Sequence, residues 1–343
     1  REGTPLLDGN RATFVWKGEQ APYLHLETDR WEATSLQEVE PGLWSFSAEF
    51  PPDAYVEYNY AVDPQDPKTI VLDPLNPRTF DSGIGHYNHY FSMPERKHTA
   101  WIERKPGVTA GTVTQHIIGG KACQGAFGVT DPQRPIWLYQ PPVNEAVPLL
   151  VVYDGRDYLE RGKIAEIVDN LIAQKTIQPI AMLLIENAKD QRFNEYNQGE
   201  GLLFTLHDSL LPLAREHLNL LDIAEQPGAY GVLGASMGGL MALYTALRMP
   251  KTFGRVIAQA GAFFHDKPQL PMLITQMLKM QDAAPLKIWQ DVGTFDFLLS
   301  ENHAMHELLL EQGCDITYRE HSSGHNYTAW RDQLPEALRT LFA

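Results

Sequence analysis

The chain has 343 residues, of which 43% are hydrophobic and 21% charged, a composition typical of a globular protein with a full-sized core. Subtracting 43 acidic residues from 28 basic ones leaves a net charge of −15, which disfavours binding to nucleic acid or to an anionic membrane surface. Two cysteines, Cys123 and Cys314, exclude a disulfide-rich scaffold and a multi-cysteine metal site, and a bridge between them is not indicated. No apolar run approaches the roughly 20 residues that a membrane-spanning helix needs.

The N-terminal part, residues 1–95, has the pattern of an all-β domain. Short runs alternate large apolar or aromatic residues with small or polar ones, and Pro and Gly separate the runs. They predict strands over residues 12–16, 22–27, 43–49 and 55–62. Strands of this length and spacing predict an immunoglobulin-like β-sandwich, and we expect the basic segment 96–110 to be a linker.

In the C-terminal part, residues 111–343, strand-like and helical segments alternate. The predicted strands cover residues 112–118, 135–140, 149–153, 180–185, 229–234, 255–260, 286–291 and 315–320. Amphipathic helices are predicted between them, for example over residues 161–174, 201–219, 238–248 and 300–312. This alternation predicts an α/β fold with a mostly parallel central sheet, helices on both faces and an antiparallel pair of strands at its start.

The sequence of residues 234–238 is Gly-Ala-Ser-Met-Gly, a Gly-x-Ser-x-Gly match between an apolar strand and a helix. This context is typical of a nucleophile elbow, in which a strained turn exposes the serine hydroxyl. The backbone two residues to either side comes too close for a side chain, which Gly234 and Gly238 allow. The pattern therefore predicts Ser236 as a nucleophile, although a serine that only caps the helix would give the same five residues.

A nucleophilic serine needs a histidine base and an acid that orients it, in the chain order Ser, Asp or Glu, His for this topology. His325 lies in a loop of small residues after the last predicted strand, with His321 as the rival nearer to the strand end. Asp296 lies in the loop after the preceding strand and is preferred to Asp291 and Glu301. The sequence therefore predicts His325 as the base and Asp296 as its orienting acid.

Two backbone N–H groups should face the oxyanion that forms during ester cleavage. The expected donors are Met237, directly after the nucleophile, and Arg156, in the loop after the predicted strand 149–153. The Arg156 guanidinium could contact substrate or pair with a neighbouring aspartate. His303 and His306 lie one helical turn apart and are interpreted as a solvated helix face, because no further metal ligand is near in sequence.

Four segments of the chain, in this order, resemble the putative esterase family of esterase D-like α/β-hydrolases, especially enterochelin (ferric enterobactin) esterases. They are the loop region 149–158, Arg-Phe-Asn-Glu-Tyr at 192–196 with Leu-Leu-Pro at 210–212, the elbow at 234–239 and Gly-His-Asn-Tyr-Thr-Ala-Trp-Arg at 324–331. The resemblance implies an α/β-hydrolase fold and a serine carboxylic ester hydrolase with the triad Ser236, His325 and Asp296. It also implies that Arg192 and Glu195 frame the substrate site.

Residues 42–63 resemble the immunoglobulin-like E-set domain that precedes the hydrolase domain in such esterases. The chain departs from the family's terminal Gly-Gly-His-Asp motif at two positions, where Ser323 replaces the first glycine and Asn326 replaces the aspartate. These changes leave the proposed chemistry intact and bear on the choice of substrate. Among the aromatic residues, the sequence predicts substrate contacts for Tyr158, Phe295 and Tyr327, with Phe193 and Tyr196 as further lining.

The predicted function is a serine esterase that acts on a small-molecule ester, with no metal and no organic cofactor in catalysis. A carbohydrate acyl or feruloyl esterase, or an acyltransferase, would use the same triad, because one acyl-enzyme serves each outcome. A carbohydrate-binding protein with a degenerate hydrolase domain is the alternative from another class. The oligomeric state is open, a homodimer included. We expect a cytoplasmic protein, and a secreted or periplasmic one is not excluded because the chain starts at Arg1 rather than Met.

Overall fold

The computed structural model describes residues 3–83, 86–119, 133–264, 272–280 and 286–343. The chain divides into two compact units. We call them the β unit, made of Arg1–His98, Gly293–Leu299 and Glu320–Ala329, and the α/β unit, made of Thr99–Val292, Ser300–Arg319 and Trp330–Ala343. Cys123 lies outside the described residues, and Cys314 is a buried free thiol.

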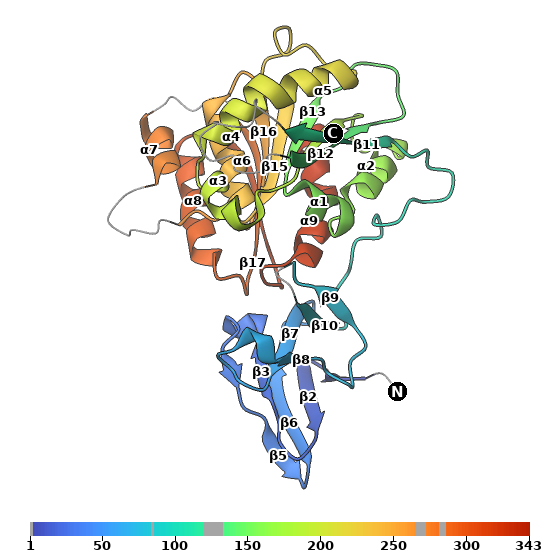
Figure 1. Ribbon diagram of the computed structural model, residues 1–343, viewed down its shortest axis with the longest axis vertical. Coiled ribbons are helices and arrows are strands. Elements are labelled where there is room, and N and C mark those ends of the chain that lie inside the picture. The colour runs from blue at the N-terminus through green and yellow to red at the C-terminus, as the bar shows by residue number, and fades with distance from the viewer. Residues whose placement is uncertain (1–2, 84–85, 120–132, 265–271, 281–285) are drawn as a thin grey trace. The chain divides into compact units, whose positions relative to one another are not determined.

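The β unit is built from two antiparallel sheets (Figure 1), with strand orders β1-β2-β6-β5 and β4-β3-β7-β10-β9; β8 pairs with β7. In chain order the strands are β1 (Leu6–Asp8), β2 (Arg11–Lys17), β3 (Tyr23–Leu26), β4 (Ala33–Thr34), β5 (Gln37–Glu40), β6 (Leu43–Glu49), β7 (Tyr55–Ala61), β8 (Ile70–Val71), β9 (Thr79–Asp81) and β10 (Tyr87–Ser92). The short helices η1 (Glu27–Asp29) and η2 (Pro67–Thr69) lie between strands.

The core of the β unit is aromatic. The ring of Phe14 meets those of Tyr58 and Phe91 edge to face, with centroids 5.0 and 5.6 Å apart. Such pairs add stability beyond their apolar area. Alternation in β2 and β6 places one face of each strand against this core, as the sequence pattern predicts.

The α/β unit contains a mixed sheet with the strand order β11-β12-β14-β13-β15-β16-β17-β18. Its strands are β11 (Thr112–Gly119), β12 (Gln133–Gln140), β13 (Leu149–Tyr153), β14 (Ala181–Ile185), β15 (Tyr230–Ala235), β16 (Phe253–Gln259), β17 (Lys287–Gly293) and β18 (Asp315–His321). β13 pairs in parallel with β14 and β15, β16 pairs in parallel with β15 and β17, and β12 is antiparallel to β11 and β14. The central strands β13, β14 and β15 are continuous apolar runs because both of their faces are buried.

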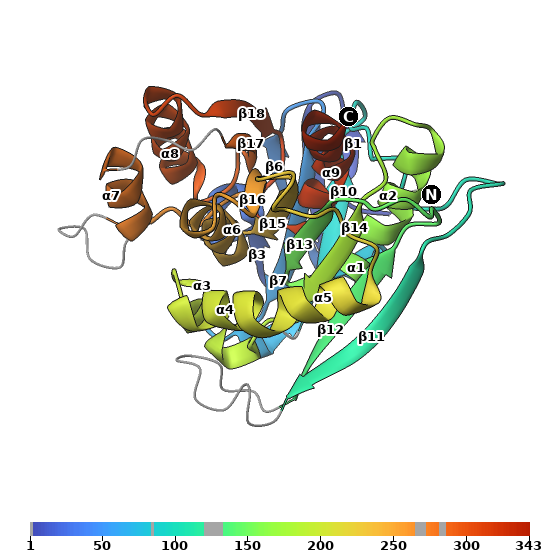
Figure 2. The same cartoon turned by 90° about the horizontal axis from the view of Figure 1, so that it is seen from above.

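Helices cover both faces of this sheet: Figure 2 shows α2 and α9 on one face and α5, α6 and α8 on the other. The helices are α1 (Gly155–Glu160), α2 (Ile164–Ala173), α3 (Arg192–Tyr196), α4 (Glu200–Thr205), α5 (Leu211–His217), α6 (Met237–Arg248), α7 (Leu273–Met280), α8 (Leu299–Glu311) and α9 (Tyr327–Phe342), with short η3 (Lys189–Gln191) and η4 (Leu206–Leu210). This is the α/β-hydrolase fold preceded by a β-sandwich that the sequence predicts, and its expected antiparallel start is the β11–β12 pair.

The segment expected to be a linker, 96–110, is bonded to the α/β unit from residue 99 onward. The Arg104 guanidinium pairs with Asp169 of α2 at 2.6 Å, and the Asn170 side chain donates to the carbonyls of Trp101 and Glu103. Residues 96–98 are grouped with the β unit. Among the described residues, no helix is long and apolar enough to cross a membrane.

Candidate active site

Ser236 lies at a sharp turn between β15 and α6. Its backbone has φ 58° and ψ −124°, a combination that L-residues rarely adopt. The turn is fixed on both sides, because the Ser236 N–H donates to the Gln259 carbonyl at 2.9 Å and the Ser236 carbonyl accepts from Ala262 N–H at 2.9 Å. Strain held in this way by its surroundings is typical of a functional position.

The glycine that precedes Ser236 by two positions is required by space. A Cβ on Gly234 would lie 2.2 Å from the Gly238 carbonyl oxygen, so the steric argument made from the sequence holds there. Met237 and Gly238 are the first residues of α6, where backbone N–H groups have no acceptor within the helix. Donors of this kind, at the positive end of a helix, suit a developing oxyanion.

The loop after β13 is tied to the start of α3 by an ion pair. The Arg192 guanidinium donates from Nε and Nη2 to the two carboxylate oxygens of Asp154, each at 2.7 Å. Asn187 also donates to this carboxylate, and the Asp154 N–H donates to the Tyr196 hydroxyl. Asp154 has φ 55°, so the left-handed residue of the turn is this aspartate.

Arg156, the expected second oxyanion donor, lies in the first turn of α1. Its guanidinium pairs with Glu186 at 2.8 Å and lies over the Trp137 ring at 5.4 Å from the ring centroid. The pairing alternative considered for this side chain therefore holds, with Glu186 as the partner in place of a neighbouring aspartate. The oxyanion role of its backbone N–H stays a prediction.

His325 and Asp296 form a hydrogen-bonded pair. His325 Nδ1 lies 2.7 Å from Asp296 Oδ2; the histidine side chain is 20% exposed and the aspartate side chain is fully buried. The other Asp296 oxygen accepts the N–H of Leu298 at 2.9 Å, which holds the carboxylate plane. The Phe297 ring lies against the imidazole, with centroids 4.8 Å apart. Both partners belong to the β unit, in the segments that follow β17 and β18, whereas Ser236 belongs to the α/β unit.

The rival residues have other partners. His321 Nδ1 lies 3.0 Å from the Ser323 hydroxyl, and both side chains are buried. Asp291 is fully buried and accepts from Trp289 Nε1 at 2.6 Å and from Gln259 Nε2 at 3.0 Å. Glu301 accepts from its neighbour Ser300. Geometry thus favours His325 and Asp296 over these alternatives.

Tyr158 and Glu195, which the sequence assigns to substrate contact, are buried. Tyr158 is fully inaccessible and donates to the Gln259 side chain at 3.0 Å, and burial raises its pKa. Glu195 Oε1 pairs with Arg134 Nη1 at 2.7 Å, and burial raises the pKa of this carboxyl. Neither side chain has surface to offer a ligand, which argues against the predicted substrate contacts.

Phe295 and Tyr327 are less buried than Tyr158 and Glu195, and their substrate contacts stay a prediction. Phe295 is half-buried and packs against the core of the β unit, and Tyr327 is 7% exposed at the start of α9. Phe297 was not predicted from the sequence. It is 53% exposed, its ring lies tilted by 43° against that of His325, and its position directly after Asp296 was a usable signal. Arg134 was not predicted either; it is a buried arginine in a strand whose other buried positions are apolar.

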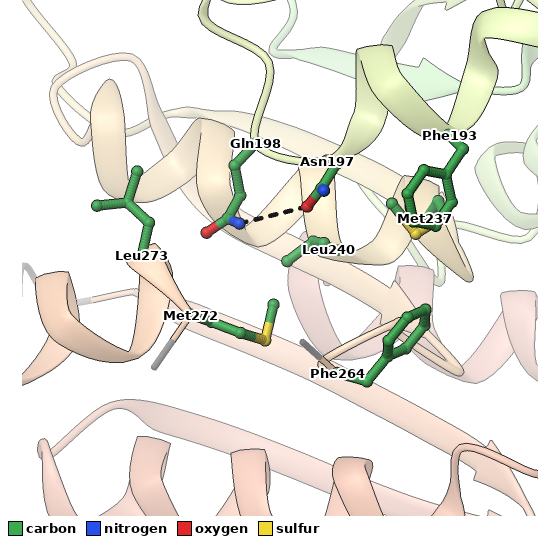
Figure 3. A pocket seen from close by; sticks show the side chains of 8 residues that line it. All are labelled: Phe193, Asn197, Gln198, Met237, Leu240, Phe264, Met272 and Leu273. Carbon is green, nitrogen blue, oxygen red and sulfur yellow. Dashed lines mark hydrogen bonds between the residues drawn. The ribbon is translucent and has the colours of Figure 1, made fainter. Parts of the chain in front are cut away.

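A pocket of about 220 Å³ lies in the α/β unit beside the first turn of α6 (Figure 3). The described residues that line it are all uncharged: Phe193, Asn197, Gln198, Met237, Leu240, Phe264, Met272 and Leu273. Gln198 donates to the Asn197 side chain across the pocket wall at 3.5 Å. Because Met237 follows Ser236, this pocket is the candidate for the acyl group of a substrate.

Metal-binding side chains do not gather in the described part of the chain. No group of three or more His, Cys, Asp or Glu residues there could hold an ion. The two helix histidines of the sequence analysis lie against Tyr318, His306 stacked on its ring with centroids 4.4 Å apart and His303 edge-on at 6.0 Å. They pack on the surface of the protein.

The strand order, the elbow after β15 and the His–Asp pair after the last strands define a protein of the α/β-hydrolase class. Comparison with known sequences identifies the family: the chain belongs to the family described as Putative esterase, whose model matches residues 129–341. The chain is 30% identical over 229 residues to an iron(III) enterobactin esterase of Dickeya dadantii (strain 3937). The matched region covers 62% of this chain and 52% of that protein. It therefore spans about half the length of this relative.

Solved structures share the fold. A ferric enterobactin esterase from Salmonella typhimurium superposes with a TM-score of 0.81 at 21% identity, over 99% of this chain and 95% of that chain. A ferulic acid esterase from Anaeromyces mucronatus superposes with a TM-score of 0.57 at 18% identity, over 70% of this chain and 94% of that one. The first similarity includes the β-sandwich as well as the α/β-hydrolase fold.

Proposed function

We propose that the protein hydrolyses carboxylic esters through an acyl-enzyme on Ser236, with His325 as the base and Asp296 as its orienting acid. The observation that carries this proposal is the backbone of Ser236, with φ 58° and ψ −124° at the start of α6. The His325–Asp296 hydrogen bond of 2.7 Å supports it. Membership of the esterase family gives the same class of reaction.

The proposed chemistry follows from this hydrogen bond. A carboxylate only accepts, so the imidazole donates from Nδ1 and its Nε2 takes the proton of the Ser236 hydroxyl. The serine oxygen attacks the ester carbonyl, and the N–H groups of Met237 and Arg156 stabilise the oxyanion. Collapse expels the alcohol, which takes the proton from His325, and water activated by the same histidine then releases the acid.

For the substrate we propose an ester of the siderophore type, a class named for the relatives reported above. The pocket beside Met237 combines apolar side chains with two amide side chains, which suits an acyl group that carries a hydroxylated aromatic ring. A feruloyl ester of a carbohydrate fits the same description and is the second candidate, supported by the ferulic acid esterase of the same fold. Acyl transfer to an alcohol would use the same intermediate.

The first test is release of nitrophenolate from p-nitrophenyl acetate and butyrate. Ser236→Ala should lower kcat by about 10⁴-fold or more, because the residual rate without a triad nucleophile comes from binding and the oxyanion donors alone. Ser300→Ala, a change of an exposed serine on α8, is the matched control and should leave kcat unchanged. A Ser236→Ala enzyme as active as the parent would contradict the proposed nucleophile.

The second test identifies the ester. Iron-free and ferric enterobactin and a feruloylated sugar are incubated with the enzyme, and the released acids are separated by chromatography. Faster release from enterobactin supports the siderophore class, and faster release from the sugar ester supports the carbohydrate class. Binding of a glycan without turnover of any ester would favour a binding protein with a degenerate hydrolase domain.

A further inference from the structure

The loop that carries His325 is bonded to a buried carboxyl of the N-terminal sandwich. Glu27, in η1 after β3, is 3% exposed. Its Oε1 accepts the N–H of Glu57 at 2.9 Å, and its Oε2 accepts from the Asn326 side-chain amide at 3.0 Å. Burial, together with repulsion from Glu57, raises the pKa of Glu27. A buried carboxyl placed in this way needs hydrogen-bond donors beside it, and a second acceptor there would be unfavourable.

Glu27 contacts the chain on both sides of His325. On one side the backbone N–H of Gly324 hydrogen-bonds to its carboxyl, and a Cβ at this glycine would lie 2.5 Å from Glu27 Oε2. On the other side is the Asn326 amide. The carboxyl therefore fixes the residues immediately before and after the histidine, while Asp296 holds the ring itself.

Asn326 serves two partners at once. Its Nδ2 donates to Glu27, and its Oδ1 accepts the N–H of Ala329 at 2.8 Å, which caps the N-terminus of α9. An aspartate at this position, as in the family motif that the sequence departs from, would still cap the helix. It could not donate, and it would bring a second carboxylate against a buried one. Asn326 can therefore donate a hydrogen bond to Glu27, which an aspartate at the same position could not.

We propose that Glu27 and Asn326 form a positioning pair, supplied by the sandwich and by the start of α9, that holds His325 in its catalytic orientation. The inference rests on the proposed function, because His325 has this role only in an esterase. Neither residue touches the reacting atoms; they act through the backbone of the histidine. The sandwich thereby supplies part of the support for the proposed base.

The loop has further anchors, so the pair can be changed without releasing it. The Tyr55 N–H donates to the Ser322 carbonyl at 2.9 Å, and Arg96 Nη1 donates to the Ser323 hydroxyl at 3.3 Å. These bonds hold the loop before His325, whereas the Glu27–Asn326 pair holds it at the histidine.

The test is a double-mutant cycle in the full chain. Asn326→Asp should lower kcat for p-nitrophenyl acetate about tenfold or more with KM within about twofold, because positioning acts on the chemical step. Glu27→Gln in the same chain reverses donor and acceptor, and Glu27→Gln with Asn326→Asp should recover kcat to within about threefold of the parent. Asn10→Asp, an exposed change in the same unit, is the matched control and should leave kcat unchanged.

A measurement that does not use activity separates this inference from the proposed function. The ring nitrogens of His325, assigned by comparison with His325→Gln, are followed by NMR in each variant. Asn326→Asp should broaden or split the His325 signals, and the double variant should restore one sharp set. Unchanged signals with unchanged kcat in Asn326→Asp would overturn the pair, as would losses that Glu27→Gln does not rescue. Turnover that is unchanged by Ser236→Ala would instead reject the proposed function, and it would not affect the NMR test of the pair.

Discussion

At the scale of single residues, the elbow fixes the backbone of the proposed nucleophile, Ser236. Ser236 keeps a rare backbone conformation because its N–H and its carbonyl are hydrogen-bonded to the main chains of Gln259 and Ala262. Such strain costs of order 1–3 kcal/mol and persists only where the surrounding structure enforces it. Packing around the turn offsets this cost. That packing requires the backbone at Gly234 to stay close to the backbone at Gly238.

Gly234→Ala tests this requirement. The new methyl group would lie 2.2 Å from the Gly238 carbonyl oxygen, which is backbone and cannot rotate away. We expect a loss of about 1–3 kcal/mol in the free energy of unfolding, as for overpacked cores, and a fall in kcat of about tenfold or more as the turn shifts. Urea unfolding and p-nitrophenyl acetate kinetics measure the two effects.

Gly313→Ala is the matched control, because a Cβ there meets nothing within 4 Å, although its φ of 75° is positive. It should cost about 1 kcal/mol of stability through backbone strain alone and leave kcat unchanged. An active, fully stable Gly234→Ala enzyme would show that the elbow can relax.

At the scale of elements, the α/β unit was predictable because each strand is a short apolar run and each helix a longer amphipathic one. All of the strands predicted there, from 112–118 to 315–320, correspond to β11–β18. In the β unit, β2, β3, β6 and β7 were predicted, whereas β1, β4, β5, β8, β9 and β10 were missed. Apart from the six-residue β10, the missed strands are two to four residues long and exposed or half-buried, so they carry no alternation to detect.

The residues around the site were only partly predictable. The order Ser236, Asp296, His325 follows from where parallel strands end, and the structure confirms the His325–Asp296 contact. The partners of buried charges did not follow, since Arg134 and Glu195 are 61 residues apart and Glu27 and Asn326 are 299 apart. Such pairs depend on tertiary contacts, and no local pattern encodes them.

The Arg134–Glu195 pair joins β12 to α3, and its side chains are 2% and 1% exposed. Glu195→Leu should destabilise the protein by about 3–5 kcal/mol, because it leaves a buried arginine that cannot lose its charge. Arg134→Met should cost less, since burial already raises the pKa of Glu195 and the carboxyl can take up a proton.

The double variant, Arg134→Met with Glu195→Leu, should recover most of the loss, because two apolar side chains replace the pair. Urea unfolding followed by circular dichroism measures all three variants against the parent. Equal losses in both single variants and in the double variant would show that the pair acts through shape and not through charge.

At the scale of the whole molecule, the net charge of −15 sets the field that a substrate meets. Basic side chains near the proposed site do little to oppose it. Arg192 is paired with Asp154, and Arg156 is paired with Glu186. A paired guanidinium has little field beyond its partner, so the overall negative potential should dominate the approach of a charged ester.

The salt dependence of kcat/KM tests this field. Lowering the ionic strength from 0.15 to 0.01 M lengthens the screening distance from about 8 Å to about 30 Å. An anionic ester such as mono-p-nitrophenyl succinate should then lose about threefold to tenfold in kcat/KM, because longer-range repulsion slows its encounter with the enzyme. Neutral p-nitrophenyl butyrate, the control, should change by less than about twofold. A rise for the anionic ester at low salt would mean that a local positive field near the site overrides the net charge.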